Sequence, residues 1–92
     1  MKTIFLVDDS ATILLSISNI LSKAGYATEK AASGEEALKK FQSGVKVDML
    51  MTDLNMPGMN GIDLIKEVRK LPNYKFMPIL FLTTESQQSK RA

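Results

Sequence analysis

Acidic and hydroxyl side chains follow three short apolar stretches of the chain, each at the point where the stretch ends. They are Asp8 and Asp9 after residues 4–7, Asp53 after residues 49–52, and Thr83 after residues 79–82. If the three stretches are neighbouring parallel strands, their carboxyl ends meet at one edge of one sheet. Three carboxylates and a hydroxyl would then gather at a single site.

Such a site needs a compensating charge. Adjacent strands lie about 4.8 Å apart, and two carboxylates about 4 Å apart repel by roughly 4 kcal/mol at an effective dielectric near 20. The chain has no histidine and no cysteine, which excludes histidine bases and zinc–thiolate centres. A ligand set that contains only oxygen atoms favours Mg²⁺. This ion keeps some of its coordination positions free of protein ligands, so that a phosphoryl group can bind there. A carboxylate beside this ion is a competent nucleophile that can form an aspartyl phosphate.

Each acid also has an ordinary structural explanation. Aspartate and serine after a strand are common helix N-caps, and Asp53 before Asn55 and Pro57 could simply begin a turn. The occurrence of all these residues together, each at a predicted strand end, favours the functional interpretation over the structural one.

The composition indicates one globular domain. The 92 residues are 45% hydrophobic and 24% charged, with a net charge of +2. The lysines are scattered rather than gathered in a stripe, so we expect no nucleic-acid partner. The first apolar run reaches two acids at once and is too short for a signal peptide or a membrane span. We therefore expect a soluble, cytoplasmic protein without a membrane partner.

Short apolar runs alternate with helical patterns along the chain. The expected strands are residues 3–7, 26–32, 47–52 and 78–82. A turn is expected at residues 55–60, and residues 83–92 read as a loop followed by the start of a helix. The alternation of strands and helices predicts an α/β fold, a doubly wound parallel sheet with helices on both faces.

Three helices connect these strands, and each has an apolar face. The first presents Ile13, Leu14, Ile17, Ile20, Leu21 and Ala24 at helical spacing, and Gly25 ends it. In the second, Ser33 and Glu36 form a capping box, Ala37, Leu38 and Phe41 point inward, and Gly44 ends the helix. The third spans residues 62–71 and buries Ile62, Ile65 and Val68.

Three segments, residues 5–10, 51–61 and 78–85, resemble the signature of the receiver domain of two-component response regulators, especially the single-domain chemotaxis type. The resemblance covers essentially the whole chain. It implies a flavodoxin-like sheet of order 2-1-3-4, an order taken from the family, with the fifth strand and last helix missing. Residues 1–92 would then form one receiver domain that is incomplete at its C-terminal end.

The resemblance also implies roles for particular residues. Asp53 is the phosphoacceptor and receives the phosphoryl group from the phosphohistidine of a sensor histidine kinase. Asp8 and Asp9 hold Mg²⁺ together with Asp53 and the backbone carbonyl of Asn55. Thr83 contacts the phosphoryl group and acts as the switch of the family.

Two residues beside the phosphoryl pocket, Asn55 and Glu85, would modulate hydrolysis of the acyl phosphate. The signal would pass by protein–protein contact to a downstream signalling protein, and the chain would not be an enzyme. Met56 and Met59, in the turn beside Asp53, are candidate contacts with the kinase.

The chain ends before the fifth strand of the family and the lysine at its end, and Lys90 lies in the wrong element to replace that lysine. An open apolar edge at residues 79–82 would invite pairing with another chain. We therefore expect low stability and self-association or domain swapping. A monodisperse monomer that melts above about 60 °C would contradict this expectation.

The residues are also compatible with two other functions. A Mg²⁺-dependent phosphohydrolase that works through an aspartyl phosphate needs a general acid–base near Asp53, and such enzymes often carry one where this chain has Asn55. A phosphorylation-independent interaction or dimerisation fragment would show no Mg²⁺ response at Asp8, Asp9 or Asp53.

Overall fold

A computed structural model describes residues 2–82 of the chain, in which four strands alternate with helices. The strands are β1 (Thr3–Val7), β2 (Ala27–Ala31), β3 (Met49–Asp53) and β4 (Ile79–Leu82). The helices are α1 (Ala11–Lys23), α2 (Gly34–Gln42) and α3 (Gly61–Arg69), followed by the 3₁₀ helix η1 (Pro72–Tyr74). The expected loop and helix start at residues 83–92 lie outside the described residues.

The four strands form one parallel sheet in the order β2-β1-β3-β4. The predicted fold class and strand order are therefore confirmed. Strand β1 lies between β2 and β3, and its last residue Val7 is paired with Thr52 of β3. Strand β3 begins two residues later than expected and includes Asp53, so the carboxyl ends of the two strands are level with each other.

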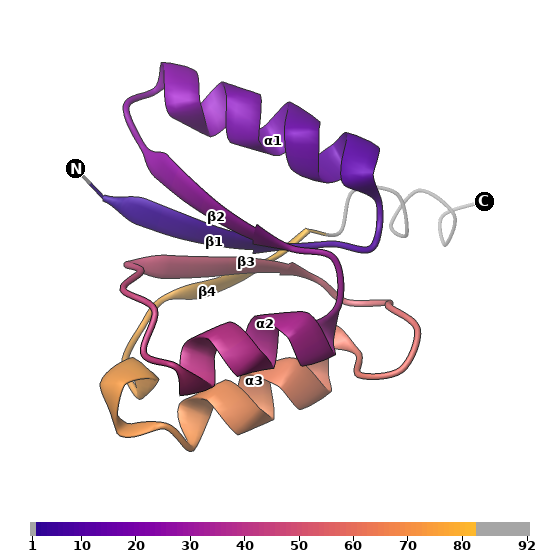
Figure 1. The fold of residues 1–92 in the computed structure, drawn as a ribbon, viewed down its shortest axis with the longest axis vertical. Coiled ribbons are helices and arrows are strands. Elements are labelled where there is room, and N and C mark those ends of the chain that lie inside the picture. Colours follow the sequence, from indigo (N-terminus) through magenta and orange to yellow (C-terminus); the bar gives the residue numbers. More distant parts are fainter. Residues whose placement is uncertain (1, 83–92) are drawn as a thin grey trace.

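Helices cover the sheet on both faces, with α1 on one side and α2 and α3 on the other (Figure 1). Alternate strand residues therefore enter two separate cores. The larger core lies under α2 and α3, where Phe41 stacks on Phe5 with ring centroids 4.7 Å apart and meets Tyr74 edge-on at 4.8 Å. The smaller core joins Leu14 of α1 to Leu6 of β1.

The helix ends are defined by side chains and glycines. Ser10, Ser33 and Asn60 each accept a hydrogen bond from the first turn of α1, α2 and α3 respectively. Gly25 has a φ of 96°, the left-handed conformation that the sequence predicted after the first helix. In the second helix Ser33 caps as expected, but Glu36 accepts from the N–H of Ala32 instead of closing the reciprocal bond to Ser33.

Two helix faces differ from the prediction. Helix α3 buries Leu64 and Val68, whereas Ile62 is 47% exposed. Ile62 lies about 140° around the helix axis from the centre of the buried pair, so its apolar side chain faces away from the sheet. Ile20 of α1 is 66% exposed for the same reason, since it lies about 120° around the helix from Leu14.

Within residues 2–82, none of the helices combines the length and the apolar character needed to cross a bilayer. The longest, α1, has 13 residues.

Candidate metal and phosphoacceptor site

Three carboxylates meet where the neighbouring strands β1 and β3 end. Asp8 and Asp9 follow β1 directly, and Asp53 is the last residue of β3. One carboxylate oxygen from each lies within 4.8 Å of the others. The structure therefore brings together the three acids that the sequence placed at one edge of the sheet.

Asp8 is the buried member of this group, with only 3% of its surface exposed, while Asp9 is exposed and Asp53 is half-buried. Burial raises the pKa of the Asp8 carboxyl, and the nearby charges of Asp53 and Asp9 raise this pKa further. The N–H of Ser10 donates to Asp8 Oδ1 at 2.9 Å and opposes part of the rise in pKa. The site therefore disfavours negative charge on Asp8 and would gain from a bound cation.

The backbone carbonyl of Asp53 is surrounded by two residues whose part in the site the sequence analysis missed. The buried hydroxyl of Thr52 donates to the carbonyl oxygen of Asp53 at 3.0 Å. A Cβ at Gly61 would lie 2.4 Å from the same oxygen, so only glycine allows α3 to begin this close to β3. Two features of the sequence could have indicated these residues: a hydroxyl residue at the end of an otherwise apolar strand, and a glycine directly after the predicted turn.

The loop between β3 and α3 carries Asn55. It is closed at its base by a hydrogen bond from the N–H of Gly61 to the carbonyl of Leu54, 3.0 Å long. Asn55 is exposed in this loop, two residues beyond Asp53. The role of its backbone carbonyl as a metal ligand stays a prediction.

The proposed kinase contact at Met56 is wrong for this conformation. Met56 is only 8% exposed and belongs to the core under α2 and α3, because the loop folds its side chain inward. Met59 is half-buried and packs against the same core. Methionine in this loop therefore anchors the loop to the domain.

Thr83 and Glu85, the expected switch residue and one of the two expected modulators of hydrolysis, lie outside the described residues. Their predicted roles stay predictions. Leu82, directly before Thr83, is paired with Asp53 in the register of β3 and β4.

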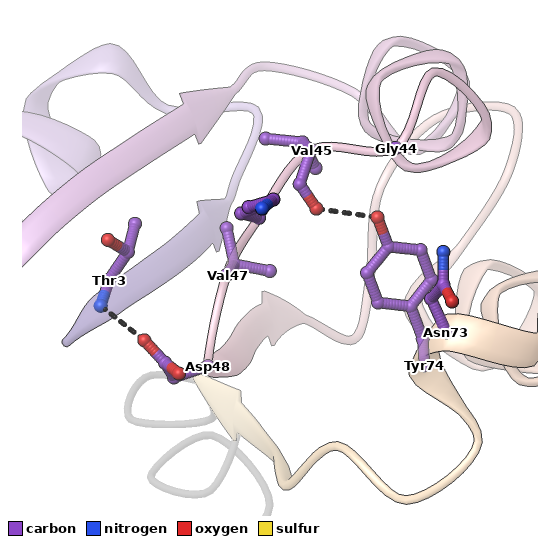
Figure 2. A pocket seen from close by; sticks show the side chains of 8 residues that line it. Thr3, Gly44, Val45, Val47, Asp48, Asn73 and Tyr74 are labelled. Carbon is purple, nitrogen blue, oxygen red and sulfur yellow. Dashed lines mark hydrogen bonds between the residues drawn. The ribbon is translucent and has the colours of Figure 1, made fainter.

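A pocket of about 470 Å³ opens at the other end of the sheet (Figure 2). Its lining includes Thr3 at the start of β1, so it lies away from the acids that follow the ends of β1 and β3. The hydroxyl of Tyr74 donates to the carbonyl of Val45, and the N–H of Thr3 donates to the carboxylate of Asp48 at 2.8 Å. These polar groups hold the surrounding loops together and do not form the acidic site.

The strand order and the acidic cluster together define a class of protein. This is a flavodoxin-like α/β domain with a candidate cation site at the carboxyl ends of adjacent strands, the edge where open parallel sheets bind ligands. The model of the response regulator receiver domain family matches residues 4–92. The chain belongs to this family, and it is a receiver domain of the chemotaxis type found in two-component signalling.

Several relatives support this assignment. Chemotaxis protein CheY1 of Helicobacter pylori is 41% identical over 88 residues, which cover 95% of this chain and 71% of that protein. Chemotaxis protein CheY of Pseudomonas aeruginosa is also 41% identical, over 95% of this chain and 70% of its own length. The solved structure of Vibrio cholerae CheY4 has a TM-score of 0.83 at 40% identity, over 99% of this chain and 79% of that one.

A further solved structure contains a kinase. It is a complex of the histidine kinase ThkA with the response regulator protein TrrA, similar to this chain with a TM-score of 0.78 and 40% identity. The match covers 88% of this chain and 67% of the matched chain.

Proposed function

We propose that this chain accepts a phosphoryl group on Asp53 from the phosphohistidine of a sensor histidine kinase, and that it does so with Mg²⁺ bound. The observation that carries this proposal is the cluster of Asp8, Asp9 and Asp53 within 4.8 Å at the end of β1 and β3. Membership of the receiver domain family supports the assignment of the phosphoacceptor role to Asp53.

The chemistry of the donor set fits Mg²⁺. The three side chains offer only carboxylate oxygens, which suit a hard divalent cation. Asp8, Asp9 and Asp53 would hold the ion, with the backbone carbonyl of Asn55. When bound, Mg²⁺ supplies positive charge that offsets the repulsion between the acids and neutralises the oxygens of the incoming phosphoryl group.

The transfer is a substitution at phosphorus. A carboxylate oxygen of Asp53 forms the new O–P bond while the N–P bond of the phosphohistidine breaks, and the imidazole leaves as a neutral group after taking up one proton. This role is supported by the surroundings of the Asp53 backbone, whose carbonyl accepts a hydrogen bond from Thr52 and lies close against Gly61. Because Asp53 is already positioned, less entropy is lost when it reaches the geometry for in-line attack.

We further propose that the chain signals by contact with a downstream protein and is not itself an enzyme. Two residues beyond Asp53 the chain has Asn55, which carries no titratable group to act as a general acid–base in repeated turnover. The ThkA–TrrA complex supports a kinase partner for a protein of this family.

The test is labelling with acetyl phosphate in Mg²⁺, followed by intact mass. We expect the wild-type chain to gain one phosphoryl group, and Asp53→Asn to gain none, because the amide is not a nucleophile toward phosphorus. Asp63→Asn, which removes an exposed acid in the first turn of α3, serves as the matched control and should label like the wild type. Undiminished labelling of Asp53→Asn would place the acceptor elsewhere.

A further inference from the structure

The first turn of α2 touches the loop between β3 and α3. The N–H of Met59 donates to Glu35 Oε2 at 3.1 Å, although the two residues are 24 positions apart in the sequence. A Cβ at Gly34 would lie 2.9 Å from the carbonyl oxygen of Met59, and one at Gly58 would lie 2.7 Å from Glu35 Oε2. Glycine at position 34 therefore allows the helix to approach the backbone of the loop, while glycine at position 58 suits the left-handed φ of 74° that the loop has there.

Glu35 has no capping role that would explain this contact. An acid in the first turn of a helix often serves the helix itself, by capping or by meeting the positive end of its dipole. In α2 the hydroxyl of Ser33 caps the helix, and the neighbouring Glu36 accepts from the N–H of Ala32 with its Oε1 at 3.2 Å, just before the helix begins. The carboxylate of Glu35 reaches the loop instead.

The loop held by Glu35 is the one that presents Asn55 beside Asp53. Its base is closed by the bond between Gly61 and Leu54, and the side chain of Met56 lies in the core. Within residues 2–82, Glu35 is the side chain that ties this loop by a hydrogen bond to α2.

We propose that Glu35 is a positioning residue of the phosphoryl-accepting site. Its carboxylate holds the loop in the conformation that presents the backbone carbonyl of Asn55 to the metal, so that the first turn of α2 forms part of the support of the site. This inference rests on the proposed function, because it concerns the affinity for Mg²⁺ and the rate of phosphorylation of Asp53.

Three variants test the proposal. Glu35→Ala removes the acceptor of the Met59 N–H, whereas Glu35→Gln retains an acceptor oxygen on a side chain of the same length. Glu36→Ala is the matched control, because it removes a hydrogen bond at the same helix end without touching the loop. The Mg²⁺ affinity is measured from the NMR shifts of the backbone amides of Asp53 and Asn55. The labelling rate is measured with acetyl phosphate, and the stability is measured by thermal unfolding.

We expect Glu35→Ala to weaken Mg²⁺ binding by about three- to tenfold and to slow labelling at low Mg²⁺, the range that one lost charge-assisted hydrogen bond on a solvent-exposed loop would give. Saturating Mg²⁺ should recover most of the rate. Glu35→Gln should bind Mg²⁺ within about twofold of the wild type. Glu36→Ala should lower the melting temperature and leave the Mg²⁺ affinity unchanged.

The proposal is overturned if Glu35→Ala binds Mg²⁺ as the wild type does, or if Glu36→Ala weakens binding equally, because the effect would then follow stability alone. It is also overturned if Glu35→Gln fails to restore binding. If the wild-type chain itself shows neither a Mg²⁺ response nor labelling, the proposed function fails and not only the role of Glu35.

Discussion

Replacing Asp8 by asparagine should stabilise the metal-free protein. Asp8 is buried, and its pKa is raised first by that burial and then by the charges of Asp53 and Asp9. When Asp8 is ionised, the folded chain holds this charge in an unfavourable place, while the unfolded chain leaves it in water. Asparagine removes the charge and keeps an oxygen that can accept from the N–H of Ser10.

The size of the effect follows from the geometry. At the outer separation of 4.8 Å, a pair of carboxylates repels by about 0.9 kcal/mol at the dielectric of water and by about 3.5 kcal/mol at an effective dielectric of 20. Because Asp8 is buried and its partners are partly solvated, we expect Asp8→Asn to raise the free energy of unfolding by about 1–3 kcal/mol. For a domain of this length that is an increase in melting temperature of about 5–15 °C.

The pH dependence has a definite sign. Since the folded-state pKa of Asp8 lies above the ordinary value of 3.8, the folded chain binds more protons than the unfolded chain between these two pKa values. The contribution of Asp8 to stability is therefore fully present below pH 3.8 and is lost as the pH rises through the raised value. The stability difference between Asp8→Asn and the wild type should grow over this window and then level off.

The assay is thermal unfolding followed by circular dichroism, in EDTA and in Mg²⁺, across this pH range. Mg²⁺ should stabilise the wild type more than Asp8→Asn, because binding to the folded state raises stability by mass action. Glu67→Gln is the control, since it removes one negative charge from an exposed ion pair of α3. If Asp8→Asn in EDTA is no more stable than the wild type, the three carboxylates do not repel one another as argued.

Three further variants test other parts of the structure. Gly61→Ala should cost about 1–3 kcal/mol and weaken Mg²⁺ binding, because the new Cβ displaces the Asp53 carbonyl; chemical denaturation and Mg²⁺ titration measure both effects. Phe41→Ala should cost about 3–5 kcal/mol, measured in urea, through the cavity left in the larger core. The self-association predicted from the sequence is tested by Leu80→Lys, which should weaken it by at least about tenfold in sedimentation velocity, because Leu80 is 50% exposed on β4, a border strand of the described sheet; a wild-type chain that stays monomeric would refute the prediction itself.

Much of the fold was predictable from the sequence because strands buried on both faces have a simple signature. The run at β1 was placed without error, and β3 and β4 within two residues. The strand order was also predicted correctly, but from the family resemblance. The alternation of strands and helices predicts a parallel sheet and does not determine the order of its strands. The faces of α1 and α3 were partly wrong at Ile20 and Ile62, because an apolar side chain can lie outside the narrow stripe that meets the sheet.

The acids of the site were predictable for a topological reason. Every parallel strand ends at the same edge, so an acid at the end of an apolar run has a known place before any coordinates are known. The contact of Glu35 with Met59 had no such signal, and the glycine after the predicted turn did not by itself show that Gly61 meets Asp53. Both contacts depend on how the first turns of α2 and α3 approach the loop after β3, and helical periodicity does not determine that approach.

Buried polarity locates the site without reference to any motif. Within residues 2–82 the buried polar or charged side chains are Asp8, Ser18 and Thr52. Ser18 donates to the carbonyl of Leu15 in its own helix, which explains its burial. Asp8 and Thr52 instead lie at the carboxyl ends of adjacent strands beside Asp53: the carboxylate of Asp8 shares the acidic cluster with Asp53, and the hydroxyl of Thr52 donates to the Asp53 carbonyl. Burying polar and charged groups costs stability. Selection for stability alone would therefore remove Asp8 and Thr52 from this place, and their presence beside Asp53 indicates selection for chemistry.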